Sequence, residues 1–378
     1  MGHGFDTKSV HITMKRDGGI PTKVTPIHQS SAFTFKDLDD IEGFYTGERE
    51  YLYTRVGNPN TDELGKAVAD LEEAPVGIAT SSGLSAIMVG ILSVAKAGDH
   101  VLASHDLYGG TYELLANELT AFGIKVSFVS FEEDIEQHIQ SNTVLLYTES
   151  ITNPLLRVED LHKVVQIAEK YKIKTMVDNT FATSYLVRPY TLGINLVVHS
   201  ATKYIGGHSD ITAGVLAGDE DLITKARQKC VNLGSNLSPF EAWLTVRGLK
   251  TLAVRMERHI HNAEKVASAL ANHPAVDKVY YPEYVSEKGR GPIVTIDITE
   301  RADIKTFLKS LDWIKIVATL AGVETTVSYP LGTSHRNLPK NVQQDLGITE
   351  GLIRISIGIE DADDIISALN HALDSAKR

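Results

Sequence analysis

Short apolar runs alternate with amphipathic segments through the middle of the chain. In order, the apolar runs are VGIATSS, HVLAS, KVSFVS, TVLLYTES, KTMVDN, LVVHSA and AGVLAG. Between them, segments such as TDELGKAVADLEE and VEDLHKVVQIAEKYK place their apolar residues at helical spacing. Buried-type strands that alternate with helices are typical of a mostly parallel sheet covered on both faces. The pattern predicts a large seven-stranded α/β domain over residues 54–240.

The two flanking regions have a different character. Residues 1–53 mix glycines and prolines with short apolar pieces and an acidic stretch, KDLDDIEG, which predicts an irregular arm that packs on something else. After residue 240 comes a long helical stretch, SPFEAWLTVRGLKTLAVRMERHIHNAEKVASALANH. It is followed by the strands PIVTIDI and LIRISIG and by a C-terminal helix. This order predicts a smaller α+β domain over residues 241–378, folded back on the large one.

Composition narrows the class of protein. The chain has 378 residues and a net charge of -11, which argues against binding to nucleic acid or to an anionic membrane surface. Cys230 is the single cysteine, so no intramolecular disulfide and no cysteine-based metal site is expected. His199, His208 and His335 lack the i, i+4 spacing of a zinc site, and we expect no metal. The N-terminus has no apolar stretch of signal-peptide length and no window approaches ~18 apolar residues, so we expect a cytoplasmic protein.

Polar or reactive side chains stand next to several of the predicted elements. Ser82 and Gly83 directly precede a helix, whose first N–H groups form a ready site for an anion. Asp178 ends an apolar strand, where a carboxylate is costly unless it has a partner. Lys203 follows another strand within SATKY, and Tyr108 precedes two glycines. Taken singly, each has a structural explanation: a helix cap, a salt bridge, a surface lysine or an aromatic ring that fills the core.

A single ligand would use all of these residues. It would carry a phosphate for the turn at residues 81–83, a flat ring for Tyr108, a basic ring nitrogen for Asp178 and an aldehyde for Lys203. Pyridoxal phosphate has these four features. A lysine forms a Schiff base with its aldehyde, and a carboxylate keeps the pyridine nitrogen protonated so that the ring can take up electrons. The constellation therefore predicts an enzyme with pyridoxal phosphate as cofactor.

Eight motifs give the chain a resemblance to a known family. They are YTRVGNPN, SSGLSA, LYGGTY, ESITNP, VDNTFAT, HSATKYIGGHSD, LTVRGLKTLAVRMERH and LIRISIGIED. With them the sequence resembles, over nearly its whole length, the Cys/Met-metabolism or trans-sulfuration family of pyridoxal-phosphate enzymes. The resemblance implies the fold type I architecture, which is similar to aspartate aminotransferase. It also implies a large, mostly parallel seven-stranded sheet with a small C-terminal α+β domain.

The resemblance also implies roles for single residues around the cofactor. Lys203 would bond to the cofactor and later move a proton, Asp178 would face the ring nitrogen, and Tyr108 would stack on the ring and could protonate the leaving sulfur. Family members often have methionine in place of Leu84, but that contact is made through the backbone. The residues implied to hold the phosphate are Ser82, Gly83, Leu84, Ser200 and Thr202.

Further residues are implied in substrate binding and assembly. Asn153 would approach the ring hydroxyl, and Arg354 would clamp the substrate α-carboxylate, a bidentate task that suits arginine. Thr319 stands where the family usually has serine and would assist it. The residues equivalent to Tyr53 and Arg55 reach the phosphate of a neighbouring subunit. The resemblance thus implies a homo-oligomer, a dimer of dimers, whose active sites are shared between subunits.

The choice of reaction depends on the distal part of the substrate pocket. Family members that act on cystathionine by γ-chemistry carry acids where this chain has Ala318 and Leu52. Two apolar residues there favour a small sulfur amino acid with an uncharged tail, such as methionine or homocysteine, or β-elimination from a cystathionine held otherwise. Methionine γ-lyases, however, usually have cysteine where this chain has Gly110. The loop at residues 281–292 is also shorter than in relatives, so substrate access could differ.

We therefore expect a carbon–sulfur lyase that performs α,γ- or α,β-elimination on methionine, homocysteine or cystathionine. A cystathionine γ-synthase or an O-acyl-homoserine sulfhydrylase, both of which carry out γ-replacement, is the alternative. An aminotransferase shares the fold but would be expected to lack YTRVGNPN and RGLKTLAVR. A regulator that binds the cofactor without catalysis would need a DNA-binding module, and no basic helix-turn-helix segment is appended.

Overall fold

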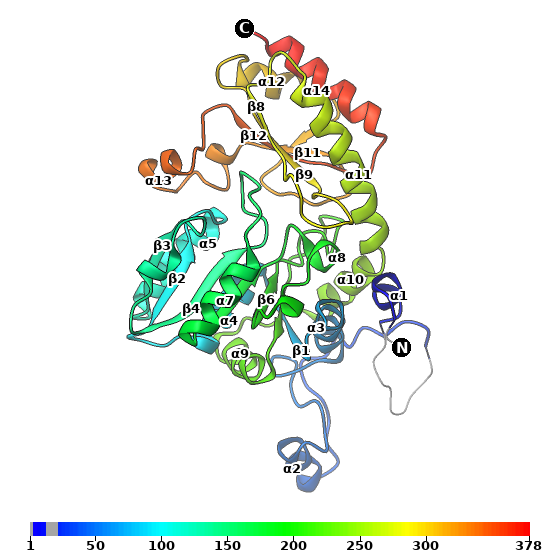
Figure 1. The fold of residues 1–378 in the computed structure, drawn as a ribbon. Helices are drawn as coiled ribbons and strands as arrows, with labels where there is room; N and C mark the ends of the chain where they lie inside the picture. The colour runs from blue at the N-terminus through cyan, green and yellow to red at the C-terminus, as the bar shows by residue number, and fades with distance from the viewer. Residues whose placement is uncertain (1–2, 13–21) are drawn as a thin grey trace.

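The computed structural model describes residues 3–12 and 22–378 and arranges them around two β-sheets (Figure 1). The part of the expected N-terminal arm at residues 13–21 lies outside the described residues. Within the described ranges, no helix is both long enough and apolar enough to cross a membrane. The sheets, their order and the helices on them fix where the polar strand ends meet.

The larger sheet contains seven strands in the order β1-β7-β6-β5-β4-β2-β3. They are β1 (Val76–Thr80), β2 (His100–Ser104), β3 (Lys125–Val129), β4 (Thr143–Glu149), β5 (Lys174–Asp178), β6 (Leu196–His199) and β7 (Gly214–Gly218). From β6 to β3 every neighbouring pair is parallel, whereas β7 is antiparallel to both β1 and β6. The prediction of a mostly parallel seven-stranded sheet is confirmed.

Helices bury both faces of this sheet. Consecutive residues of β6 illustrate the arrangement: Val198 packs in one apolar cluster with α4 (Gly83–Val94) and α9 (Glu220–Leu233), and Val197 packs in another with α7 (Leu161–Tyr171). Side chains along a strand alternate between the two faces, so a strand with both faces covered needs apolar residues at every position. This is why the strands appear in the sequence as continuous apolar runs.

The remaining helical segments of the large domain are shorter or lie at its edges. They are α3 (Pro59–Glu72), α5 (Gly109–Glu113), the π-helical η1 (Leu114–Glu118), α6 (Leu119–Ala121), η2 (Ile135–His138), α8 (Thr183–Leu186) and η3 (Pro189–Leu192). Local sequence explains where two of the longer helices begin. Ser82 caps α4 by accepting the Ser85 N–H at 3.1 Å, and Asn58 caps α3 directly before a proline at the first helical position.

The long helical stretch expected after residue 240 is two helices. α10 (Pro239–Leu249) ends and α11 (Leu252–Ala271) begins around a break at residues 250–251. Gly248 lies so close to the Gly206 carbonyl that a Cβ atom there would be 2.1 Å from the oxygen. The buried Arg255 bridges the same place, because its guanidinium donates to the carbonyls of Gly248 at 2.9 Å and of Tyr204 at 2.7 Å. The break therefore serves to hold the segment that follows Lys203.

The smaller sheet has five strands in the order β10-β11-β12-β9-β8. They are β8 (Lys278–Tyr280), β9 (Ile293–Asp297), β10 (Lys315–Ile316), β11 (Thr326–Ser328) and β12 (Leu352–Ser356), accompanied by α12 (Ile304–Ser310), η4 (Pro330–Gly332), α13 (Lys340–Asp345) and α14 (Ala362–Ala376). The sequence predicted only β9 and β12. The other three strands are two or three residues long, which is too short for an alternating pattern to show.

The N-terminal arm is less irregular than expected. The part of it that the structure describes contains the helices α1 (Phe5–Val10) and α2 (Leu38–Thr46), and Asp37 caps the second by accepting the Asp40 N–H at 2.9 Å. The helix α2 projects away from the rest of the chain (Figure 1). It leaves two large apolar side chains in the open, since Leu38 is 82% exposed and Tyr45 is 70% exposed.

Candidate active site

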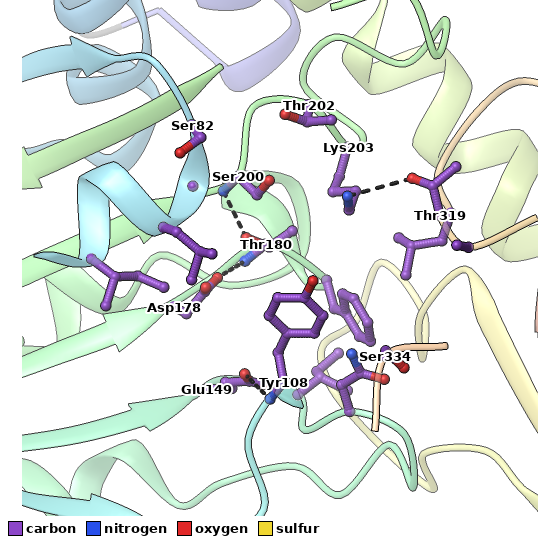
Figure 2. A pocket seen from close by; sticks show the side chains of 18 of the residues that line it. Ser82, Tyr108, Glu149, Asp178, Thr180, Ser200, Thr202, Lys203, Thr319 and Ser334 are labelled. Carbon is purple, nitrogen blue, oxygen red and sulfur yellow. Dashed lines mark hydrogen bonds between the residues drawn. The ribbon is translucent and has the colours of Figure 1, made fainter. Parts of the chain in front are cut away.

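The polar strand ends predicted from the sequence meet in one cavity of about 240 Å³ (Figure 2). The ends of β4, β5 and β6, the start of α4 and the loop before α5 form it, and Arg354 on β12 reaches it from the smaller sheet. Its lining residues include the expected Ser82, Gly83, Leu84, Tyr108, Asn153, Asp178, Ser200, Thr202, Lys203, Ala318, Thr319 and Arg354. They also include Ile151, Glu149, Thr180, Phe181, Leu320 and Ser334.

One end of the cavity is suited to an anion. The N-terminus of α4 opens here, and unpaired N–H groups at a helix start attract negative charge. Gly83 lies against Ser200, because a Cβ atom at Gly83 would be 2.7 Å from the Ser200 Cβ. Any larger residue would push the helix start away from the end of β6. Thr202 is held in place by its hydroxyl, which accepts the Ala213 N–H at 3.0 Å.

The amine of Lys203 projects into the same cavity. Its Nζ lies 3.4 Å from the Thr319 hydroxyl, the one hydrogen bond that this amine makes to any described residue (Figure 2). Burial, together with the positive charge of Arg354, lowers the pKa of Lys203 to about 8, and Asp178 opposes this shift. A lysine with such a pKa is a usable base and nucleophile near neutral pH.

This pKa predicts how the cofactor-free protein reacts. The neutral amine is the nucleophile, so arylation of Lys203 by 2,4-dinitrofluorobenzene should rise with pH and reach half its maximal rate near pH 8. Surface lysines should need a pH about two units higher. Peptide mass spectrometry at a series of pH values gives the profile for each lysine. A Lys203 profile that coincides with those of Lys66 and Lys225, both exposed, would contradict the assignment.

Asp178 lies at the end of β5 and is held by its neighbour two residues on. Its Oδ1 accepts the Thr180 N–H at 2.9 Å, and the Thr180 hydroxyl both hydrogen-bonds Asp178 and accepts the Ser200 N–H at 2.8 Å (Figure 2). Burial raises the pKa of Asp178, and the bonds from Thr180 pull in the opposite direction. Thr180 thus ties the acid of β5 to the segment that leads from β6 to Lys203.

Tyr108 projects into the cavity from the loop before α5 and is 40% exposed (Figure 2). Its backbone N–H donates to Glu149 Oε1 at 2.7 Å. Its ring folds over Gly110, where a Cβ atom would be 2.6 Å from the Tyr108 Cε1. The cysteine that methionine γ-lyases usually carry at this position would therefore displace the ring from the place it takes here.

Arg354 is buried and its guanidinium faces the cavity. One Nη donates to Asn153 Oδ1 at 2.9 Å, while Nε has no partner among the described residues. Burial lowers the pKa of Arg354 to about 10, so it stays cationic at neutral pH. His335 fixes Asn153 from behind, because its Nε2 donates to the Asn153 carbonyl at 2.9 Å, and burial lowers the pKa of His335 to about 4. A cation with a free donor is thus presented to an incoming carboxylate.

Three residues of the expected site do not line this cavity. Leu52 and Tyr53 belong to the arm and Arg55 lies two residues after its end, and Tyr53 and Arg55 line a separate surface groove with Ser30, Asn236 and Pro239 among others. Arg55 lies over the Tyr53 ring, with 5.6 Å between its Cζ and the ring centroid. That the arm serves another subunit stays a prediction.

Eight of the lining residues were not predicted from the sequence: Ile87, Glu149, Ile151, Thr180, Phe181, Thr212, Leu320 and Ser334. Glu149 and Ile151 lie in the motif ESITNP, and Thr180 and Phe181 lie in VDNTFAT. From these two motifs the sequence predicted only Asn153 and Asp178 as site residues. Their positions at or near the ends of predicted strands could have indicated these residues. Any residue within two or three positions of the end of a parallel strand faces the same edge of the sheet.

Comparison with known proteins decides the family. The model of the family described as Cys/Met metabolism PLP-dependent enzyme matches residues 6–374. The chain belongs to this family. It is therefore a pyridoxal-phosphate enzyme of sulfur amino-acid metabolism, as the motifs implied.

Several members of the Cys/Met-metabolism family are similar to this chain over their whole length. A cystathionine gamma-lyase of Bacillus subtilis is 40% identical, with 98% of this chain and 99% of the relative covered. A cystathionine beta-lyase of Lactococcus lactis subsp. cremoris is 37% identical, with 97% and 98% covered. An L-methionine gamma-lyase of Porphyromonas gingivalis is 37% identical, with 99% and 98% covered.

Solved structures give the same family. A cystathionine gamma synthase from Xanthomonas oryzae pv. oryzae, in complex with aminoacrylate and cysteine, matches with a TM-score of 0.93 and 32% identity, covering 99% of both chains. A Campylobacter jejuni protein described as an O-acetylhomoserine (thiol)-lyase matches with a TM-score of 0.93 and 29% identity, covering 99% of this chain and all of that one. That structure carries a pyridoxyl-lysine phosphate.

The residues present in the cavity fit the family's cofactor. An amine with one long hydrogen bond, a buried carboxylate, a partly exposed aromatic ring and hydroxyls at a helix start surround one space. The close approach of Gly83 to Ser200 leaves backbone rather than side chain at the anion end. The aldehyde, the ring nitrogen, the ring face and the phosphate of pyridoxal phosphate therefore each have a matching group in this cavity.

Proposed function

We propose that the protein is a carbon–sulfur lyase that cleaves the thioether or thiol of an amino acid with an uncharged tail. Methionine and homocysteine are the substrates of this kind. The observation that supports the proposal most strongly is the apolar character of one wall of the cavity. Ile151, Phe181 and Leu320 belong to one buried apolar cluster, and the exposed Ala318 lies beside them in the lining.

Charge supports the same choice. Among the described residues that line the cavity, the acids are Glu149 and Asp178, both at strand ends on the floor. The distal ammonium group of cystathionine would need an anion near Ala318, and burying it without one is costly. A methylthio or thiol tail needs only apolar contact, which this wall supplies.

The proposal assigns the following roles to residues of this chain. Arg354 binds the α-carboxylate with its free donor and is held in place by Asn153. Lys203 accepts the proton from the α-carbon, and its lowered pKa makes Nζ a suitable base. Asp178 would pair with the ring nitrogen of the cofactor, and the Tyr108 hydroxyl would give a proton to the departing sulfur. When bound, pyridoxal phosphate supplies the electron sink that stabilises the negative charge formed at the α-carbon.

Two further arrangements belong to this proposal. The cofactor phosphate is held by Ser82–Leu84, Ser200 and Thr202 together with Tyr53 and Arg55 of a second copy, in a dimer of dimers. The projecting α2 and the exposed ring of Tyr53 support a shared site, since both leave apolar surface uncovered on a single chain. We also propose the division into an arm (1–53), a cofactor domain (54–240) and a small domain (241–378).

A second candidate is γ-replacement, in which a thiol is added rather than released. The similarity to a cystathionine gamma synthase and to a protein described as an O-acetylhomoserine (thiol)-lyase supports it. Both activities use the same cofactor frame and differ in the fate of the bond at the γ-carbon. Product analysis therefore separates them directly.

A substrate panel tests the proposal. The enzyme is incubated with L-methionine, L-homocysteine, L-cystathionine, L-cysteine, or O-acetyl-L-homoserine plus sulfide, and the products are identified by mass. We expect 2-oxobutyrate and ammonia, with methanethiol from methionine or hydrogen sulfide from homocysteine. The kcat/KM for methionine or homocysteine should be at least about tenfold above that for cystathionine, because a buried charge without a partner costs more than the ~1–3 kcal/mol of an unpaired neutral group. A new thioether or thiol formed from O-acetyl-L-homoserine without 2-oxobutyrate would favour γ-replacement.

The variant Ala318→Glu sharpens the same test. Adding an anion to the apolar wall should raise kcat/KM for cystathionine relative to methionine by about tenfold, because the distal ammonium gains a partner. Ala318→Gln is the matched control, since it has the same size without the charge. If the two variants shift the ratio equally, charge at residue 318 does not select the substrate.

A further inference from the structure

Glu149 is a buried acid in the cavity to which the roles above assign nothing. It ends β4, is 6% exposed and stands directly opposite Asp178 in the pairing of β4 with β5. Both side chains line the same cavity (Figure 2). Two carboxylates from neighbouring strands thus face one small space, and two like charges so placed cannot both ionise at low cost.

The surroundings of the two acids are unequal. Asp178 receives hydrogen bonds from both the backbone and the side chain of Thr180, and the charges of Lys203 and His199 act on it. For Glu149 the donor is the Tyr108 N–H, and the charged groups that act on it are Asp178, Asp106 and Glu159, which are all acidic. Burial and these negative charges raise the pKa of Glu149 well above its usual range.

The loop that carries Tyr108 needs an anchor. Tyr108 stands at the N-cap position of α5 without a side-chain cap, and the helix is five residues long. The two residues after it are glycines, and Gly109 packs so closely on the Ser334 carbonyl that a Cβ atom would be 1.9 Å from the oxygen. The bond to Glu149 joins the start of this glycine-rich turn to the end of β4.

We propose that Glu149 is a positioning residue that works as the neutral carboxylic acid. Its Oε1 accepts the Tyr108 N–H and fixes the tyrosine ring over the cofactor. Because Glu149 is then uncharged, Asp178 is left as the one anion among the described residues that line the cavity floor. Asp178 would then pair with the ring nitrogen of the cofactor. The proposal rests on the family's cofactor and is independent of which sulfur compound the enzyme cleaves.

The test compares cofactor binding in three proteins. Wild type, Glu149→Gln and Glu149→Ala are freed of cofactor, and the dissociation constant for pyridoxal phosphate is measured by quenching of protein fluorescence. Glutamine keeps an acceptor of the same shape for Tyr108 but cannot ionise. We expect alanine to weaken binding by about tenfold, and glutamine to restore the affinity to within about threefold of wild type.

The charge state is read separately from the absorbance of the bound cofactor as a function of pH. We expect the pH at the midpoint of the absorbance change in Glu149→Gln to stay within about 0.3 pH units of the wild-type value. Asp178→Asn, the matched control, should move this midpoint by about one pH unit or more. Calorimetry in buffers of different ionisation enthalpy should give the same number of protons exchanged on cofactor binding for wild type and Glu149→Gln.

Three results would overturn the proposal. A midpoint lowered in Glu149→Gln by as much as one unit would mean that an anion near the cofactor had been lost. A different number of protons exchanged on cofactor binding by wild type and Glu149→Gln would also mean that Glu149 carries a charge. Unchanged affinity in Glu149→Ala would show that the bond to Tyr108 does not place the ring. If the alanine variant does not fold, the midpoint and proton count of Glu149→Gln decide the question.

Discussion

Replacing Lys203 by alanine is expected to lower kcat for every substrate by at least about 10⁴-fold. The change removes the only amine among the described residues that line the cavity, and with it both the covalent attachment of the cofactor and the base whose pKa is about 8. Residual activity from binding alone should be near the limit of detection. Steady-state assays of methanethiol release from methionine and of hydrogen sulfide release from homocysteine measure the loss.

The fold should survive this change, because the Lys203 side chain makes one hydrogen bond to the described residues, at 3.4 Å, and the following turn is anchored by Arg255. Circular dichroism and thermal unfolding serve as the control. Lys203→Arg, which keeps a charge but cannot attack an aldehyde, should be as inactive as Lys203→Ala. Lyase rates close to wild type in either variant would remove Lys203 from the chemistry.

Replacing Arg354 by alanine is expected to raise KM for every amino-acid substrate by about 10²-fold, equivalent to about 3 kcal/mol. The guanidinium is buried, and Lys203 is the one other cation among the cavity-lining residues that the structure describes. Removing it leaves the substrate carboxylate without its partner and Asn153 Oδ1 without its donor. Initial rates over a wide substrate range separate KM from kcat.

Arg354→Lys is the informative companion. It keeps the charge but loses the planar fork, so KM should fall between those of wild type and Arg354→Ala. The absorbance of the bound cofactor should persist in both variants, since Arg354 is assigned to substrate rather than cofactor. A KM for methionine that is unchanged in Arg354→Ala would place the carboxylate elsewhere.

The sequence was a good guide to the large sheet and its reactive edge. Strands buried on both faces are continuous apolar runs, so the last residue of each run, such as Asp178, could be placed at the carboxyl edge with little ambiguity. The same reasoning placed Lys203 and the turn before α4 at the carboxyl edge of the sheet. Their convergence on one cavity needed only the rule that parallel strands end together.

Other parts depended on long-range packing. No local pattern shows that β12, far along the chain, returns Arg354 to the cavity, and only the resemblance suggested it. Glu149 was overlooked because a carboxylate that accepts a backbone N–H from another loop has no signature in its own strand. The helix break near Gly248 arises from contact with Gly206, which propensity along the helix does not reveal.

The covalent bond between Lys203 and pyridoxal phosphate tests the account most directly. The purified, cofactor-loaded protein is reduced with borohydride and digested, and the peptides are analysed by mass spectrometry. The account predicts loss of the yellow absorbance and a phosphopyridoxyl group on the peptide that contains Lys203, at about one per chain. An unmodified Lys203 peptide, or attachment to another lysine, would contradict it.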